Sequence, residues 1–412
     1  VEEFFKQCAV HFHSLGIDIY YYDSSETEET RLIVEDWMVR YTHIHYIRIP
    51  STWHANRKVM SIFEQYGLEQ TYDYLWVSGD AIRCSESVMR QVVSALERRY
   101  DMMIVNGMDC PIGTREYTDA NELFQDCAWY TTLFGGVILN VHTMLAKVPW
   151  RKLQEKYEIP ERINYSHVGL YFEVLCRLHE FRAFHLAVGG GLRTSALKEK
   201  GGWYRETFQV LCEYWPSTIN ALPQYYTNKI RAMNKLGYYS CFTPSAFLSY
   251  RKGNVYNLSI LLKYRKTLEG MSGFDFIQLL GLLYLKPRPA VFFANRDFTG
   301  YVKELRKEWL LRIFCRAHSV LYIYGAGIRA VPYARYLQAK GIKLQGFIVT
   351  AKDGNPDLLL ECPVITLAEL GKPCGKLGII MGLSRKNLDA VEPVLKKLNM
   401  WQNTYHEDLK FF

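Results

Sequence analysis

Residues 16–37 read GIDIYYYDSSETEETRLIVEDW, and this stretch decides the fold class. A β-rich run ends at Asp23, a short polar turn follows, and acidic residues then lead into an apolar pattern typical of a capped helix. Two further strands are predicted at 43–50 (HIHYIRIP) and 72–80 (YDYLWVSGD), with a helix between them at 55–68. Strands that alternate with helices at this spacing predict an α/β domain, its sheet mostly parallel and covered by helices on both faces.

The pattern changes twice along the 412 residues, a length that suits two or three domains. Residues 1–202 carry the strand–helix alternation described above. Residues 203–316 are dominated by helical, aromatic-rich segments with prolines between them, and a second alternation of strands and helices occupies residues 317–412. We therefore expect an α/β domain, a helical region and a smaller α/β domain, in that order.

A glycine-rich turn marks the start of the last domain. In YIYGAGIRA (322–330), Gly325 and Gly327 stand between a predicted strand and a predicted helix, which is the context of a Rossmann nucleotide-binding turn. The acid that binds the ribose hydroxyls should end the next strand, GFIVTAKD (346–353), but Asp353 comes late. The segment resembles the small Rossmann-like modules of polysaccharide-biosynthesis proteins. We expect no tightly bound NAD(P) here and a docking or structural role instead, with a bound dinucleotide as the alternative.

Charge and cysteine content limit the classes of function. The net charge is +8, and the basic residues are scattered rather than gathered in a stripe, so we expect no nucleic-acid partner. Such a charge fits anionic small substrates, an acidic membrane surface or simply a mildly basic solvated surface. The ten cysteines show no CxxC spacing, which indicates neither a zinc site nor a disulfide framework and points to a reducing, cytoplasmic compartment.

We see no secretory leader and no apolar run long enough to cross a bilayer. The best candidate is FDFIQLLGLLYL (274–285), which a proline-rich segment closes. It predicts a core helix, with contact to a membrane surface as the alternative. We therefore expect a soluble, intracellular protein, with peripheral contact to the inner face of the membrane or to other biosynthesis proteins as a further expectation.

Two acids end predicted strands of the first domain, Asp23 and Asp80. In a parallel sheet, ligands bind beyond the carboxyl ends of the strands. A carboxylate there can accept hydrogen bonds from a base or ribose, or hold a divalent metal against a diphosphate. Arg57, Lys58 and Arg83 are near in sequence and can balance the phosphate charge. The alternative for either Asp is a turn or a helix cap.

The order of these motifs resembles the family 2 inverting glycosyltransferases of the GT-A fold. The resemblance rests on residues 16–37 and on HANRKVMSIFEQYGLEQTYDYLWVSGDAIRCSESVM (54–89), and it covers the predicted first domain. It implies a GT-A mixed sheet and a nucleotide-sugar donor. By the same resemblance, Asp23 contacts the nucleotide base, Asn56 shapes the nucleotide pocket, and Asp80 is the first acid of the metal-binding DxD motif.

The sequence departs from the family pattern in two places. Ala81 and Ile82 replace the second and third acids after Asp80, so the conventional two-carboxylate clamp is absent. We expect either weak binding of Mn²⁺ or Mg²⁺ or help from another ligand. In addition, these domains begin with a strand that helps grip the base, and no such strand precedes Glu2. Because the chain starts at Val rather than Met, we expect that strand to be trimmed.

A further segment resembles the part of the family that follows the DxD strand, LFQDCAWYTTLFGGVILN (123–140). There Gly135 and Gly136 would let the backbone approach the sugar closely, and Trp129 and Tyr130 would form a stacking wall. The alternative is a strand entered through a glycine bulge, with both aromatic side chains in the core.

Inversion at an anomeric carbon requires a base that removes the proton of the acceptor hydroxyl. In the family this base is usually an Asp in a Glu-Asp pair that heads a helix. Ser166 and His167 stand at the corresponding place in NYSHVGLYFEVLCRLHEF (164–181). His167 is therefore the first candidate base, or a metal ligand that replaces the lost acids, and Asp126 is the second candidate base. A structural role for His167 stays open.

The sequence thus predicts transfer of a sugar, from a UDP-linked donor by preference, to a glycan or glycoconjugate acceptor with inversion, in bacterial surface polysaccharide synthesis. A rival interpretation is an NAD(P)-dependent oxidoreductase or epimerase centred on Gly325 and Gly327. A third is a non-catalytic partner subunit of a glycosyltransferase complex, in which the incomplete DxD motif reflects lost chemistry.

Overall fold

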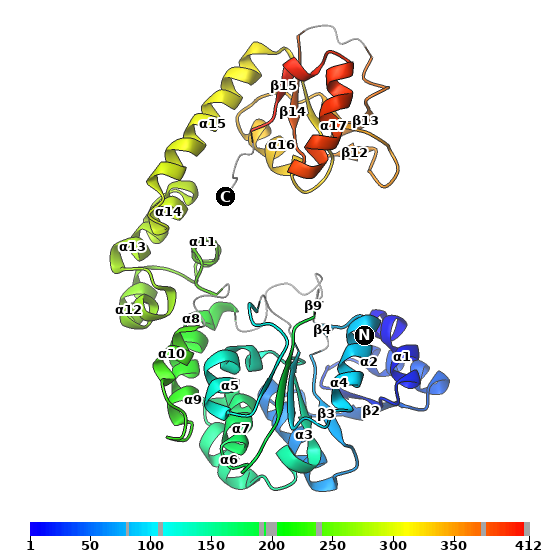
Figure 1. The fold of residues 1–412 in the computed structure, drawn as a ribbon, viewed down its shortest axis with the longest axis vertical. Helices are drawn as coiled ribbons and strands as arrows, with labels where there is room; N and C mark the ends of the chain where they lie inside the picture. Colours follow the sequence, from blue (N-terminus) through cyan, green and yellow to red (C-terminus); the bar gives the residue numbers. More distant parts are fainter. Residues whose placement is uncertain are drawn as a thin grey trace. The chain divides into compact units, whose positions relative to one another are not determined.

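A computed structural model describes residues 1–79, 82–105, 110–188, 193–194, 204–235, 241–371 and 376–407. The chain divides into two compact units, residues 1–283 and 284–412, and each contains strands and helices (Figure 1). The predicted α/β class is confirmed. No helix among the described residues is long and apolar enough to cross a membrane. The pattern-based division into residues 1–202, 203–316 and 317–412 stays a prediction.

The first unit opens with the predicted alternation of helices and strands. These elements are α1 (Glu2–Ser14), β1 (Ile19–Asp23), α2 (Glu29–Arg40), β2 (Ile44–Arg48) and α3 (Ala55–Glu69). β1 and β2 are parallel and form a two-stranded sheet, in which Asp23 lies opposite Arg48 at the carboxyl ends. Phe5, Val34 and Ile44 form part of a small core between this pair and the first two helices.

A five-stranded sheet has the order β3-β7-β5-β8-β6. Its strands are β3 (Tyr74–Trp76), β5 (Met102–Val105), β6 (Arg115–Tyr117), β7 (Val137–Asn140) and β8 (Ala183–Leu186). β5 and β8 are parallel, but β7 is antiparallel to both β3 and β5, and β6 is antiparallel to β8. The expected mostly parallel arrangement is therefore wrong for this sheet, and the sheet is mixed. The connection from Val105 to Arg115 is too short for a crossover, so β6 runs opposite to β5.

Helices lie on both sides of the five-stranded sheet (Figure 1). On one side, α4 (Glu86–Leu96) packs through Val88 and Val92 against a core that includes Met103 and Phe184. On the other side lie α5 (Ala120–Cys127), α6 (Trp150–Tyr157) and α7 (Ser166–Leu175). The short helical segments η1 (Ala128–Thr132), η2 (Val141–Leu145) and η3 (Ile163–Tyr165) connect these elements, and β4 (Ile82–Arg83) pairs with β9 (Arg193–Thr194).

The predicted helical stretch follows. Its elements are η4 (Tyr204–Glu206), α8 (Thr207–Gln209), η5 (Val210–Tyr214), α9 (Trp215–Ala221), α10 (Lys229–Asn234), α11 (Pro244–Lys252), α12 (Leu258–Ser272), α13 (Phe276–Tyr284), α14 (Pro287–Ala294) and α15 (Phe298–Ala317). α13 is the helix predicted at 274–285. It buries Leu279 and Leu282 as a core helix does, whereas Ile277 and Tyr284 are exposed.

The second unit contains a six-stranded sheet with the order β12-β13-β11-β10-β14-β15. Its elements are β10 (Val320–Tyr324), α16 (Ala330–Ala339), β11 (Gly346–Val349), β12 (Leu358–Leu359), β13 (Cys362–Thr366), β14 (Leu377–Met381), α17 (Arg385–Lys397), η7 (Trp401–Asn403) and β15 (Thr404–Tyr405). β10 is parallel to both β11 and β14. Ile323 packs on the face covered by α16, and its neighbour Tyr324 packs on the face covered by α17. The sheet is parallel except for β12, which is antiparallel to β13, and helices cover both of its faces.

Candidate functional site

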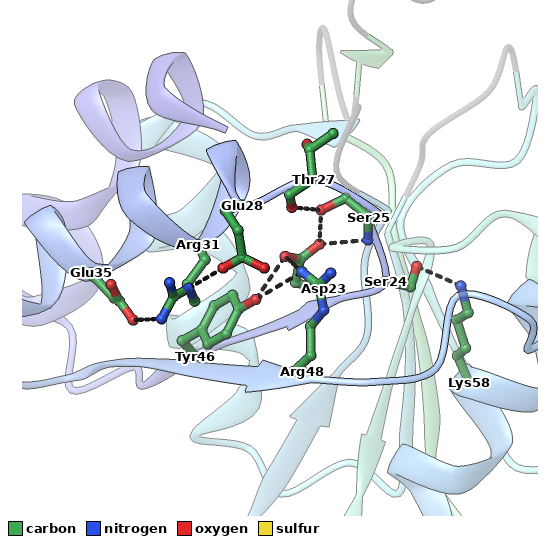
Figure 2. Close-up of polar contacts among 10 residues, drawn as sticks. All are labelled: Asp23, Ser24, Ser25, Thr27, Glu28, Arg31, Glu35, Tyr46, Arg48 and Lys58. Atoms are coloured by element: carbon green, nitrogen blue, oxygen red, sulfur yellow. Dashed lines mark hydrogen bonds and ion pairs between the residues drawn. The ribbon is translucent and has the colours of Figure 1, made fainter.

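The turn after β1 is organised by the carboxylate of Asp23 (Figure 2). One oxygen accepts hydrogen bonds from the backbone N–H and hydroxyl of Ser25, at 2.8 and 2.7 Å. The other accepts from the hydroxyl of Tyr46 and from Arg48, both at 2.8 Å. Burial alone would raise the pKa of Asp23, but the hydrogen bonds from Ser25 and Tyr46 and the charge of Arg48 outweigh it and lower the pKa. Asp23 is thus an ionised anchor between this turn and β2.

The first turn of α3 carries two cations, and one of them, Lys58, reaches the turn after β1. The ammonium of Lys58 donates a hydrogen bond of 2.5 Å to the hydroxyl of Ser24 (Figure 2). The guanidinium of Arg57 lies over the ring of Trp53, 4.9 Å from its centroid. Within the described ranges, neither cation forms an ion pair with a carboxylate. Two such cations at the positive end of a 15-residue helix suit an anionic ligand.

Asn56 and His167 form a buried link between α3 and α7. The side-chain amide of Asn56 lies 2.7 Å from Nδ1 of His167 and donates a second hydrogen bond of 2.9 Å to the carbonyl of Asn164. Since the amide donates to Nδ1, Nε2 carries the proton and faces the carbonyl oxygen of Thr132 at 3.3 Å. Burial lowers the pKa of His167 to about 4, so the ring is neutral near pH 7.

This geometry argues against a catalytic role for His167. Its side chain is 1% exposed and both ring nitrogens have partners. The predicted pocket residue Asn56 is 4% exposed and uses its amide to hold this contact. Both residues therefore fix where α3, α7 and η1 meet.

Gly135 lies beside the segment that leads to Asp80. Its backbone has a φ of 87°, which favours glycine, and a Cβ there would lie 2.6 Å from the Ser78 hydroxyl. The N–H of Gly135 donates to the carbonyl of Val77 at 2.8 Å. A Cβ on Gly136 would lie 3.1 Å from the Leu133 carbonyl oxygen and 3.3 Å from that of Tyr130, with the Leu133 Cβ at 3.4 Å. This close approach of two backbone segments sets the position of the chain immediately before Asp80.

Around this segment, two of the positions predicted from the sequence are not described by the structure, and three others are buried. Asp80 and Ala81 lie outside the described residues, so the predicted DxD motif stays a prediction. Ile82 is part of the core with Val88. Trp129 and Tyr130 are 7% and 5% exposed, as the core interpretation of the aromatic pair requires.

Asp126, the second candidate base, lies on α5 with its side chain 28% exposed. One carboxylate oxygen is 3.1 Å from the ammonium of Lys235. The other is 3.4 Å from Arg115 and 3.3 Å from the hydroxyl of Tyr117. The contacts with Arg115 and Tyr117 are long, and the side chain stays partly accessible to solvent. Asp126 therefore combines a negative charge, flanking cations and solvent access, which His167 does not.

His185 is a buried histidine that the sequence analysis did not single out, and it lies across the sheet from Arg115, a partner of Asp126. His185 on β8 pairs in register with Arg115 on β6. Its Nδ1 contacts the carbonyl of Gly113 at 3.1 Å, and its Nε2 is buried without a hydrogen-bond partner among the residues that the structure describes. Burial lowers the pKa of His185, so the ring is neutral and Asp126 supplies the nearby charge.

The predicted residues thus fall into separate groups. Asp23 and Lys58 share the turn after β1, Asn56 and His167 share the buried link, and in the described part of the chain no hydrogen bond or ion pair joins Asp126 to either group. No three His, Cys, Asp or Glu side chains among the described residues are arranged to hold a metal ion. A site that includes Asp80 falls outside this statement.

In the second unit, the glycine-rich turn follows β10. Gly325 has a φ of 102°, and a Cβ there would lie 2.9 Å from the carbonyl oxygen of Gly382, so glycine is required by the packing of two loops. A Cβ on Gly327 would meet nothing within 4 Å. At the end of β11 the hydroxyl of Thr350 lies 3.1 Å from that of Tyr324, and Asp353 is exposed further along the loop.

No protein-family model matches the chain, and no curated protein matches it.

Proposed function

We propose that the chain is a family 2-like inverting glycosyltransferase of the GT-A fold with a C-terminal Rossmann-like domain. It transfers a sugar from a UDP-linked donor to a glycan or glycoconjugate acceptor in surface polysaccharide synthesis. The motif order in residues 1–202 supports this proposal. The observation that carries it is the pair of cations in the first turn of α3, Arg57 and Lys58. Neither forms an ion pair among the described residues, and Lys58 contacts the Asp23 turn through Ser24.

In this proposal the donor diphosphate binds at the first turn of α3. Lys58 exchanges its contact with the Ser24 hydroxyl for a phosphate oxygen, and Arg57 supplies a second positive charge. Asp23 keeps the turn and Arg48 in place at the nucleoside end. Asp80 is the carboxylate that would hold Mn²⁺ or Mg²⁺ against the diphosphate, and the chemistry such an ion supplies is neutralisation of the leaving group's charge.

The reaction needs one base and one stabilised leaving group. The acceptor oxygen forms a bond to the anomeric carbon from the face opposite the diphosphate, and the bond from that carbon to the phosphate oxygen breaks. The departing UDP keeps the electron pair, which Arg57 and Lys58 stabilise. Asp126 takes the proton of the acceptor hydroxyl. We favour Asp126 over His167 because an accessible carboxylate can reach an acceptor, whereas both nitrogens of His167 are engaged.

Replacing Lys58 tests the donor site. Lys58→Ala is expected to weaken UDP binding by roughly ten- to a hundred-fold, because a hydrogen bond to a charged phosphate is lost. Titration calorimetry with UDP measures the change. Lys152→Ala is the matched control, since Lys152 is an exposed lysine on α6 and forms no ion pair in the described structure. UDP affinity equal to that of the unmodified protein in Lys58→Ala would place the nucleotide elsewhere.

One rival function differs from this proposal in the ligand that it binds, and the other differs in having no turnover. An oxidoreductase or epimerase would bind NAD(P) at Gly325 and Gly327, where Gly327 leaves open space for a ligand. We propose a docking or structural role for this domain instead, because Thr350 follows β11 at the place where an acid is needed. A non-catalytic partner subunit would bind UDP without turnover.

A further inference from the structure

The long helix α15 (Phe298–Ala317) carries an apolar stripe that faces away from its own unit. We use the name outer stripe for five side chains: Phe298, Val302, Leu305, Trp309 and Ile313. They are 61%, 64%, 44%, 60% and 43% exposed. Their spacing of three or four residues places them on one face of the helix.

The opposite face of α15 is already packed. Leu311 and Cys315 belong to the core beneath the six-stranded sheet. The hydroxyl of Tyr405 donates a hydrogen bond of 2.7 Å to the carbonyl of Lys307, and that of Tyr336 donates one of 2.8 Å to Glu308. These contacts fix the rotation of the helix, so the outer stripe is a permanent feature of this unit.

The exposed charges on α15 around the outer stripe are positive, apart from Asp297, which caps the N-terminal end of the helix through the N–H of Gly300. Lys303, Arg306, Arg312 and Arg316 are all exposed on α15. In the part of the chain that the structure describes, Lys303, Arg306 and Arg316 form no ion pair.

The acids of α15 do not offset these cations. The side chains of Glu304 and Glu308 are 5% and 16% exposed. Glu304 pairs with Arg288 and Lys307. Glu308 pairs with Arg288 and Arg312. Beyond the cap residue Asp297, the exposed side of the helix is therefore apolar and basic among the described residues.

We propose that the outer stripe is a membrane-binding surface that lies in the plane of a bilayer containing anionic lipids. Trp309 and Phe298 suit the boundary between headgroups and acyl chains, and the flanking cations suit acidic headgroups. Stripe-to-stripe packing with a second copy would bring cations against cations, so charge complementarity favours the lipid surface. This proposal does not depend on the proposed transferase activity.

Vesicle sedimentation of the full chain tests the proposal. The protein is expected to bind vesicles of equimolar phosphatidylcholine and phosphatidylglycerol, not vesicles of phosphatidylcholine alone, and to dissociate as salt is raised. Replacing Leu305 and Trp309 together by Ser is expected to weaken partitioning at least about ten-fold, because the apolar area that enters the bilayer is lost. Arg306→Glu with Arg316→Glu is expected to weaken it by more than about ten-fold.

Matched controls come from α17 and its C-terminal end in the same unit. Val394→Ser with Leu398→Ser removes two apolar side chains of similar exposure, and Lys397→Glu reverses a charge outside the outer stripe. Melting temperatures show that each variant folds. Absence of binding to the anionic vesicles overturns the proposal, and so does equal binding by outer-stripe and control variants. A concentration-dependent dimer that Trp309→Ser dissociates, without vesicle binding, would assign the face to a second copy.

Discussion

Asp126→Asn is expected to lower turnover by roughly a hundred- to ten-thousand-fold while leaving UDP affinity nearly unchanged. The amide keeps the size of the carboxylate but cannot accept the proton of the acceptor hydroxyl. Asp126 has no contact with the Asp23 turn or with Lys58 among the described residues, so donor binding is not affected. Turnover with a UDP-sugar donor and UDP titration calorimetry, measured on the same preparation, separate the two effects.

The matched control for Asp126→Asn is Glu122→Gln. Glu122 lies one turn earlier on α5 and binds the same partner, Arg115. If the Asp126 effect came from releasing Arg115, the Glu122 variant would show a similar loss. Near-normal turnover in Asp126→Asn would remove Asp126 from the reaction. Loss of UDP affinity in that variant would make it a binding residue instead.

His167→Ala is expected to lower the free energy of unfolding by roughly 2–4 kcal/mol. The change leaves a cavity at the contact of α3, α7 and η1 and removes the partner of the buried Asn56 amide. Chemical denaturation at pH 7.5 measures the loss. The exposed His142, which pairs with Asp73 at 3.4 Å, provides the control His142→Ala. Stability close to that of the unmodified protein, with a collapse of turnover, would return the base role to His167.

The pH dependence of the same residue has a definite sign. The pKa of His167 is lowered to about 4 in the fold, whereas an unperturbed histidine has a pKa of about 6.5. Above about pH 6.5 the neutral ring contributes its full stability. As the pH falls from about 6.5 to about 4, the unfolded chain takes up a proton that the folded chain does not, and this contribution is lost. Denaturation curves should therefore show a weaker pH dependence in His167→Ala across this interval.

Local pattern was enough to predict most of the elements that support the candidate site. The run that ends at Asp23 becomes β1, the segment after His54 becomes α3, and SVLYIYGAG (319–327) becomes β10 and its turn. In each case the period of the apolar residues indicates the same element as the neighbouring turn or cap residue, and the fold contains that element. The position of Asp23 at the carboxyl end of a parallel strand follows from the same pattern.

The partners of these residues depend on register and long-range packing. Tyr46 and Arg48 reach Asp23 because β2 pairs with β1 in the register that sets Asp23 opposite Arg48. Their spacing of two residues places both side chains on one face of the strand, and this signal is present in the sequence. Lys235 meets Asp126 from 109 residues away, and no local signal predicts that contact.

The histidine shows where local pattern misleads. At the start of a helix, His167 occupies the place of a catalytic acid in sequence, but α3 and η1 close over it and bury both ring nitrogens. The direction of β7 is a second example. Its short apolar run is compatible with a strand, but only the packing between β3 and β5 makes it antiparallel to both.

Hydrogen–deuterium exchange with saturating UDP tests the central claim most directly, because it reports where the nucleotide binds without requiring the acceptor. We expect slower amide exchange in residues 24–30, after β1, and in residues 55–60, the first turn of α3. The effect should be absent in Lys58→Ala at the same UDP concentration. Unchanged exchange in both segments, with protection of residues 325–331 by NAD(H), would contradict the account and favour the oxidoreductase.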